Sequence, residues 1–276
     1  MTNVMIMAHR GASYHAPENT KAAFLKAYDF AADGIETDLQ LTKDGEIVVH
    51  HNYFVDNTSD GKGAIIFKDL SELKKYDFGA YKAREFQGEG ILTLAELLPL
   101  LKDMDVINLE LKSHINKSMP FASKVLQIVE ESGWKDKVIY SSFDADLLRQ
   151  LKQQNPECKV GLLTFYERMQ VFMREMKAAF LASYPSMDNE NILKNLEKTQ
   201  TLVELVDSLD YKPDYLHPDY HSVLDDANLV KEMHARGIGV NPYTCDNAEE
   251  MQKLIEAGCD GIITNRPDIA REVCGR

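Results

Sequence analysis

The stretch GIETDLQLTKDGEIVVHH, residues 34–51, decides how the strands of this chain are counted. It holds two extended segments, 34–40 and 46–51, separated only by LTKDG. That spacer is too short for a crossover between parallel strands, which takes about a dozen residues or more. Asp44-Gly45 is instead a hairpin turn signal. The sequence therefore predicts that 46–51 is a return strand, antiparallel to 34–40.

Most other apolar segments alternate with amphipathic ones, as in βαβ units around a parallel sheet. The strand candidates of this kind are 4–9, 34–40, 106–112, 137–143, 159–164, 214–219, 237–244 and 261–265. They number eight, as in a TIM (β/α)8 barrel of ~250 residues. The alternative is an open doubly wound sheet, but no Gly-rich phosphate turn follows the first strand. We therefore expect an α/β fold in which residues 1–276 form one TIM-barrel domain.

Two segments exceed a plain barrel. Residues 52–92 are rich in glycine and have no long helical period, so we expect a small inserted lobe after the second strand and its hairpin. Residues 165–210 have the pattern of two or three extra helices. A stripe at helical spacing in this segment is interpreted as a buried core face, with a lipid or partner groove as the alternative. The stripe consists of Phe165, Met169, Met173, Met176 and Phe180.

Composition narrows the class of protein. Hydrophobic residues make up 44% and charged residues 27%, as in soluble globular proteins, and no apolar run approaches the ~20 residues of a membrane span. The net charge of -13 disfavours nucleic acid and anionic membranes as partners, but it does not exclude a small anionic substrate. The chain starts without a signal-peptide pattern. Its four scattered cysteines suit reduced thiols in a cytoplasmic protein.

Carboxylates recur at alternate positions of two predicted strands. Glu36 and Asp38 share one face, and Glu110 and Lys112 repeat the arrangement. Barrel enzymes build their sites at the carboxyl ends of the strands. Three carboxylates converging there suit a hard divalent cation, Mg²⁺ or Ca²⁺. The alternative is that these carboxylates pair with Lys112, with Arg10 or with the backbone.

Histidines end two of the predicted strands. His9 closes the first, where it is a candidate acid or base, although a structural histidine is the simpler interpretation. His50 and His51 close the hairpin, and strand alternation turns only one of them inward. A two-residue loop places Asp38 opposite His51, and a three-residue loop of Lys43 to Gly45 places it opposite His50. The residues alone do not choose between the two.

Four motifs resemble the glycerophosphodiester phosphodiesterase family. They are AHRGASYHAPENT (8–20), GIETDLQLTKDGEIVVHHN (34–52), INLELK (107–112) and GCDGIITNRPD (258–268). The resemblance implies a TIM barrel with a small lobe inserted after the hairpin. It also implies that His9 and His51 serve acid–base catalysis, which leaves His50 for the outer face.

The same resemblance implies how the substrate is held. Glu36, Asp38 and Glu110 match the ligands of a divalent metal, Mg²⁺ or Ca²⁺. Arg10 and Lys112 match positions that hold the phosphate. The implied reaction is hydrolysis of a glycerophosphodiester to glycerol 3-phosphate and an alcohol, by a phosphoric diester hydrolase. The alternatives are a lysophospholipase D-like or other phosphodiesterase, and a barrel that binds phosphodiesters without turnover.

The chain departs from the family pattern at several positions. Asn52 stands where an Asp usually follows the second histidine, and Asn57 replaces an Arg. The late WTVN motif is YTCD, Tyr243 to Asp246, so Tyr243 is the expected substrate-lining residue in place of Trp. The late TDRPD is TNRPD, with Asn265. These departures leave the substrate preference and the tuning of His51 open.

Overall fold

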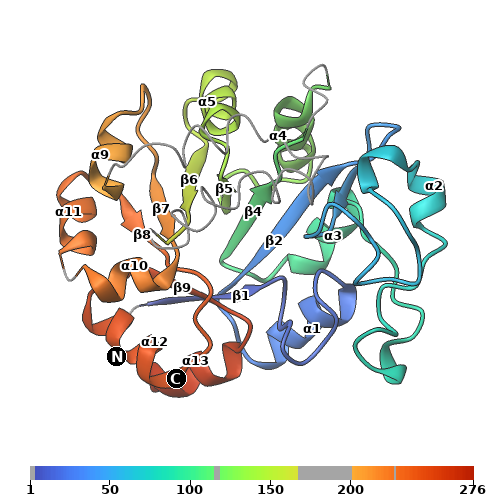
Figure 1. Cartoon of the computed structure of the whole chain (residues 1–276), viewed down its shortest axis with the longest axis horizontal. Coiled ribbons are helices and arrows are strands. Elements are labelled where there is room, and N and C mark those ends of the chain that lie inside the picture. Colours follow the sequence, from blue (N-terminus) through green and yellow to red (C-terminus); the bar gives the residue numbers. More distant parts are fainter. Residues whose placement is uncertain (1–3, 115–118, 167–200, 227) are drawn as a thin grey trace, which may run out of the picture.

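A computed structural model of the chain describes residues 4–114, 119–166, 201–226 and 228–276. Within these ranges nine strands form one sheet, in the order β8-β7-β6-β5-β4-β2-β1-β9, with β3 paired to β2 (Figure 1). The strands are β1 Met5–His9, β2 Gly34–Leu41, β3 Ile47–Val49, β4 Val106–Leu111, β5 Val138–Ser142, β6 Lys159–Thr164, β7 Tyr215–Pro218, β8 Gly239–Val240 and β9 Gly261–Thr264.

All neighbours along this order pair in parallel, and the two outer strands approach each other. The amide of Asp260 donates to the carbonyl of Val240 at 2.9 Å, and that of Ile263 donates to the carbonyl of Pro242 at 3.0 Å. These hydrogen bonds bring β9 beside β8 and nearly close a barrel of eight parallel strands. The predicted TIM barrel is confirmed, and the open doubly wound sheet is wrong.

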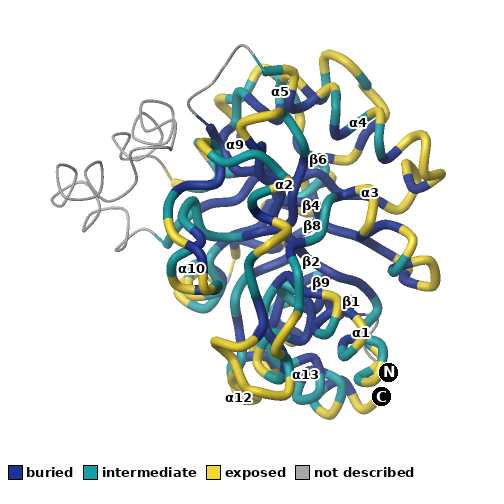
Figure 2. Tube along the Cα trace, turned by 90° about the vertical axis from the view of Figure 1, so that its right-hand side faces the viewer, coloured by how far each residue is buried: buried dark blue, intermediate teal, exposed yellow. Residues whose placement is uncertain are grey.

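Helices surround the strands, and their exposed positions face outward (Figure 2). Polar caps start several of them: Asp144 accepts from two amides at the start of α5, and Asn247 does the same for α12. The α-helices are α1 Lys21–Asp29, α2 Leu70–Leu73, α3 Leu94–Leu97, α4 Phe121–Glu131, α5 Ala145–Gln154, α9 Leu202–Asp207, α10 Tyr220–Asp225, α11 Leu229–Ala235, α12 Ala248–Glu256 and α13 Pro267–Val273. Short 3-10 helices are η1 Ile65–Phe67, η2 Arg84–Phe86 and η3 Leu98–Leu101.

The main core lies between the strands and these helices. Both faces of β2 and β4 are buried, as expected for strands that are covered by helices on one side and fill the barrel on the other. Ile35, Leu39 and Leu109 are fully buried in this core, and Phe24 of α1 packs into it. The strands therefore form a rigid support for the side chains at their carboxyl ends.

β2 and β3 form the predicted hairpin. Leu39 pairs with Val49 and Leu41 with Ile47, and the amide of His50 donates to the carbonyl of Asp38 at 3.0 Å. The loop therefore has three residues, and of the two alternatives it is the one that sets Asp38 opposite His50. Its last residue, Gly45, has φ 80°, the left-handed position that closes such loops.

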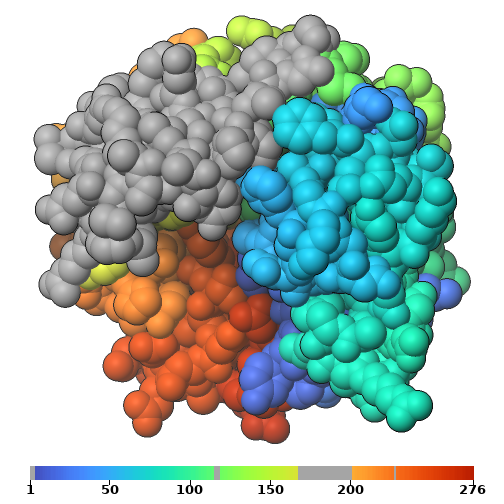
Figure 3. Space-filling model, turned by 45° about the vertical axis from the view of Figure 1, so that its right-hand side comes forward, coloured from blue at the N-terminus to red at the C-terminus, as the bar shows by residue number. Residues whose placement is uncertain are grey.

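A second, smaller hydrophobic cluster lies beside the hairpin. The chain between β3 and α3 wraps around it with η1, α2 and η2, and forms one continuous cyan surface in Figure 3. The cluster consists of Val48, Val55, Ile65, Leu73, Phe78 and Ile91. That residues 52–92 form a separate lobe stays a prediction. So does the extra helical segment 165–210, because 167–200, with most of the Met-rich stripe, lie outside the described residues.

The described helices are each too short or too polar to span a membrane. The four cysteines are buried and free.

Candidate active site

The carboxyl ends of β1, β2 and β4 bring the candidate residues together. His9 is in register with Glu36 on the neighbouring strand, and Asp38 is in register with Glu110. Lys112 follows directly after β4. Because these strands are parallel neighbours, their side chains meet at one rim of the barrel.

Three buried carboxylates form the centre of this site. Glu36, Asp38 and Glu110 each place one oxygen within 4.8 Å of the others. Lys112 Nζ lies 2.8 Å from Asp38 Oδ1 and 2.5 Å from Glu110 Oε1. Arg10 Nε lies 3.5 Å from Asp38 Oδ2. The cluster therefore combines three carboxylates with two cationic side chains in a space shielded from water.

The charges in this cluster do not balance. Burial, with Asp38 and Glu110 nearby, raises the pKa of Glu36 well above its usual value. Burial also raises the pKa of Glu110 to about 6, although Lys112 opposes the shift. Burial alone would raise the pKa of Asp38 too, but Lys112 and other cationic neighbours hold it well below its usual value. The raised pKa values of Glu36 and Glu110 reflect burial and repulsion between neighbouring carboxylates, which a divalent cation would relieve.

The donor set supports the same assignment. Asp38 Oδ1 is buried and pairs with Lys112 Nζ at 2.8 Å. Oxygen atoms from three carboxylates are the ligands that Mg²⁺ and Ca²⁺ prefer in proteins. Glu36, Asp38 and Glu110 are thus able to hold such an ion.

Asn19 orients Asp38, and the sequence did not single it out. Its Nδ2 donates to Asp38 Oδ2 at 2.8 Å, and its Oδ1 accepts from the Thr37 hydroxyl at 2.7 Å. Asn19 has φ 59°, a conformation that asparagine tolerates better than most residues. The PENT part of the first motif was the available signal for this role.

Arg10 and Gly11 make a sharp turn after β1. Arg10 has φ 55° and its amide donates to both the carbonyl, at 2.8 Å, and the carboxylate, at 3.2 Å, of Glu36. Its guanidinium pairs with Glu18 at 3.0 Å. Gly11 has φ 78°, and a Cβ there would lie 2.6 Å from the backbone of Ala23. The turn thus requires glycine and fixes Arg10 over the carboxylates.

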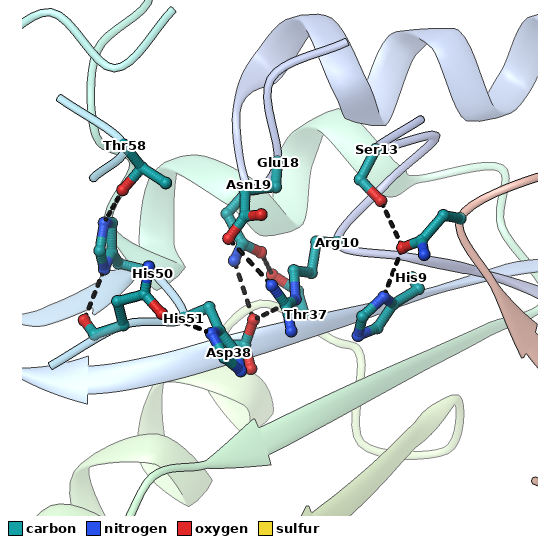
Figure 4. A network of polar contacts seen from close by, with 12 residues as sticks. His9, Arg10, Ser13, Glu18, Asn19, Thr37, Asp38, His50, His51 and Thr58 are labelled. Carbon is teal, nitrogen blue, oxygen red and sulfur yellow. Dashed lines mark hydrogen bonds and ion pairs between the residues drawn. The ribbon is translucent and has the colours of Figure 1, made fainter. Parts of the chain in front are cut away.

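His9 is held by a neighbour from β9's carboxyl end. Its Nδ1 lies 2.6 Å from Asn265 Oδ1, an oxygen to which Ser13 also points (Figure 4). Its Nε2 lies 3.7 Å from Glu36 Oε2. Burial, assisted by the charge of Arg10, lowers the pKa of His9 to about 3. The imidazole is therefore neutral at pH 7.

His51 reaches the cavity and His50 does not. His51 Nδ1 lies 3.0 Å from Asn52 Oδ1, and burial beside Lys112 lowers its pKa well below the usual value. His50 donates from Nδ1 to the Asn52 carbonyl at 2.8 Å and accepts from the Thr58 hydroxyl at 2.8 Å. His50 does not line the cavity; it is only 4% exposed and packs against Phe78.

Gln40 explains how His51 enters the site although Asp38 faces His50. β3 ends at Val49, and the chain then turns. Gln40 Nε2 lies 2.8 Å from the carbonyls of His50 and Asn52, which it holds as a donor. This buried amide on β2 shapes the turn, and no pattern in the sequence indicated it.

A cavity of about 290 Å³ opens over these groups. One side is charged and the other aromatic: Phe143 stacks on Phe165 at 4.3 Å, and Tyr243 meets Phe143 edge-on at 6.0 Å. Asp38 lies directly behind the lining at Lys112. The predicted site residues that line the cavity are His9, Arg10, Glu36, His51, Glu110, Lys112 and Tyr243.

Comparison with known proteins agrees with this geometry. Residues 9–269 match the Glycerophosphoryl diester phosphodiesterase family. A glycerophosphodiester phosphodiesterase of Caldanaerobacter subterraneus subsp. tengcongensis is 34% identical over 96% of this chain and 95% of its own. One of Bacillus subtilis is 27% identical over 98% of this chain and 86% of its own.

A solved structure is similar over the whole fold. It is a phosphodiesterase of Oleispira antarctica in complex with the product sn-glycerol-3-phosphate, with a TM-score of 0.77 and 25% identity over 99% of this chain and 97% of that one. The fold, the site and these matches define the class as TIM-barrel phosphodiesterases. Within that class, the chain belongs to the glycerophosphoryl diester phosphodiesterase family.

Proposed function

We propose that this protein hydrolyses glycerophosphodiesters to glycerol 3-phosphate and an alcohol, with a divalent cation and two histidines. The observation that carries the proposal is the convergence of His9, His51, two cationic side chains and the carboxylate cluster on one cavity. The product bound to the Oleispira antarctica phosphodiesterase supports the same substrate class.

The cationic side chains and the carboxylates have separate roles in the proposed reaction. Arg10 and Lys112 offset the charge that develops on the phosphoryl oxygens. A divalent ion held by Glu36, Asp38 and Glu110 would supply Lewis-acid polarisation of the phosphoryl group.

The histidines move the protons. One takes a proton from the nucleophile and the other gives one to the leaving alkoxide. Both are neutral in the free protein. The bound phosphodiester anion raises the pKa of the histidine that must act as the acid, since a nearby negative charge favours imidazolium.

A lysophospholipase D-like activity is the second candidate. The aromatic side of the cavity, formed by Phe143, Phe165 and Tyr243, offers an apolar surface to a larger alcohol. A cytoplasmic location is also part of the proposal, because free, buried cysteines persist in reducing compartments.

The test is a panel of glycerophosphodiesters and lysophospholipids, with detection of glycerol 3-phosphate or choline and with Mg²⁺ or Ca²⁺ added to chelator-treated protein. His9→Ala and His51→Ala should each lower turnover by at least ~10²-fold. His234→Ala is the matched control, because His234 is exposed on α11 and pairs with Asp260. Near-wild-type rates for both cavity variants would refute the mechanism. Substrate-induced thermal stabilisation without product would instead indicate a binding protein.

A further inference from the structure

Asp246 and Asn265 lie behind His9 and are joined by several hydrogen bonds. Asp246 Oδ1 accepts from the Thr264 hydroxyl at 2.9 Å and from the backbone amide of Asn265 at 2.8 Å. Asp246 Oδ2 accepts from Asn265 Nδ2 at 2.7 Å. An ionised carboxylate can only accept hydrogen bonds, so the NH₂ group of Asn265 must face Asp246.

This orientation turns the amide oxygen of Asn265 toward His9. The oxygen lies 2.6 Å from His9 Nδ1 and accepts from the Ser13 hydroxyl at 2.7 Å. It has no proton to give, so Nδ1 of a neutral His9 must carry the proton of this contact. Nε2 then keeps its lone pair. It stands 3.7 Å from Glu36 Oε2, beyond hydrogen-bond distance, in a residue that lines the cavity.

We infer that Asp246 and Asn265 are positioning residues that hold His9 in its Nδ1–H tautomer and leave Nε2 as the proton-accepting atom. The inference rests on the proposed function only for the use made of that lone pair. The tautomer itself follows from the chain of donors and acceptors. Without Asp246 the Asn265 amide is free to turn over, and His9 can adopt the Nε2–H tautomer, which has no lone pair toward the cavity.

Two single substitutions should disrupt this series of hydrogen bonds in different ways. In Asp246→Asn, the new amide oxygen still accepts from Thr264 and from the backbone, so its NH₂ replaces Oδ2. Asn265 must then turn its own oxygen toward position 246 and its NH₂ toward His9, which moves the ring proton to Nε2. In Asn265→Asp, two carboxylates face each other at the present 2.7 Å contact.

The double variant Asp246→Asn/Asn265→Asp should restore the series of hydrogen bonds from position 246 to His9. An amide at position 246 donates to a carboxylate at position 265, which again accepts from His9 Nδ1 and from Ser13. We expect each single variant to lower kcat by about 10-fold or more, on the scale of a misplaced acid or base. The double variant should return to within about threefold of the unsubstituted protein.

The ring ¹⁵N chemical shifts of His9 give a readout that is independent of activity. In the Mg²⁺-supplied protein at pH 7.5 they should report Nδ1–H, and in Asp246→Asn they should report Nε2–H. Asn247→Ala is the control, because it removes the cap of α12 next to Asp246 and leaves the hydrogen bonds to His9 in place. This control variant should lower Tm. It should leave the His9 tautomer unchanged and alter kcat by no more than about twofold.

The outcomes separate the two claims. An Nδ1–H tautomer that persists in Asp246→Asn, or a double variant no more active than the singles, would overturn the positioning role. If the unsubstituted protein showed the expected tautomer but released no product from any substrate, the proposed function would fail and the positioning of His9 would stand.

Discussion

At the scale of single residues, Nδ1 of each cavity histidine lies within hydrogen-bond distance of an amide oxygen rather than a carboxylate. Asn265 accepts from His9, and Asn52 Oδ1 lies 3.0 Å from His51. An amide oxygen accepts a hydrogen bond but supplies no negative charge to favour imidazolium. Burial therefore dominates, and both pKa values are low.

Asn52→Asp should raise the pKa of His51, because a carboxylate beside the ring stabilises its charged form. The limb of the pH–rate profile governed by His51 should move to higher pH by about one unit or more. The measurement is kcat/KM between pH 5 and pH 9.

Asn57→Asp is the matched control, since Asn57 is exposed further along the same loop. It should leave the profile in place. A profile that did not move in Asn52→Asp would show that position 52 does not control the ionisation of His51.

The sequence predicted these residues unevenly. The family motifs singled out His9, His51 and the three carboxylates, whereas residue types at strand ends alone left a structural histidine and carboxylate–cation pairs as alternatives. Asn19 and Gln40 were missed, since a buried amide resembles any polar residue until its partners are known. The choice between His50 and His51 depended on three-dimensional detail, namely a loop length and a turn that begins after Val49.

At the scale of elements, β2 and β4 carry the three carboxylates of the proposed metal site. Alternation along β2 places Glu36 and Asp38 on one side, and the parallel register brings Glu110 of β4 beside Asp38. The raised pKa values of Glu36 and Glu110 mean that protons compete for the same oxygens.

Cation binding should therefore depend on pH. Since the pKa of Glu110 is about 6, affinity for Mg²⁺ or Ca²⁺ should fall as pH drops from 7.5 to 5, by up to about tenfold per pH unit for each proton displaced. Calorimetric titrations in two buffers of different ionisation enthalpy measure both the affinity and the protons released.

Glu110→Gln should bind the cation more weakly and release fewer protons. An affinity that stays constant from pH 5 to pH 7.5 would contradict the idea that the carboxylates bind protons in the metal-free protein.

The predicted strands are all present, because strand–helix alternation and the short LTKDG spacer are strong local signals. Their ends were less certain: β3 stops at Val49 rather than at position 51. A side chain from a neighbouring strand, Gln40, sets that end through its contacts with backbone carbonyls. Such a tertiary contact leaves no periodic trace in the sequence.

At the scale of the whole molecule, several buried histidines make the folded state less stable as the pH falls. Burial lowers the pKa of His217 to about 3 and that of His50 to about 4, and His9 behaves similarly. In the unfolded chain these groups take up protons near pH 6.5, so below that pH the unfolded state binds more protons than the folded state.

The free energy of unfolding should therefore rise with pH between about 4 and 6.5 and level off above. Each buried histidine contributes up to about 1.4 kcal/mol per pH unit in that window. Glu36 and Glu110 act in the opposite direction from about pH 4.5 upward, because their pKa values are raised on folding. Urea unfolding at pH 7.5, 6.0 and 5.0 measures the net slope.

His217→Gln separates one contribution. His217 lies between Asn108 and Asn241 inside the barrel, and a glutamine keeps a polar group there without a titrating ring. In this variant the free energy of unfolding should change less steeply with pH, by the amount that corresponds to about one proton. Equal slopes in both proteins would mean that His217 is not neutral in the folded state.

The barrel itself was predictable, since eight strand–helix repeats leave few other arrangements. The proposed lobe at 52–92 and the extra segment at 165–210 stay predictions, because glycine content and helical spacing describe a segment without saying how it packs.

The three-residue hairpin loop has a consequence for how this protein can evolve. β3 leads directly into the turn that carries His50 and His51, so a shift of one residue in its pairing with β2 would displace both histidines. Substitutions around the cavity mouth alter the active site one contact at a time. A single insertion or deletion between Lys43 and Gly45, at the far end of the hairpin, would displace a proposed catalytic group. Selection should therefore act more strongly on the length of that loop than on its amino-acid sequence.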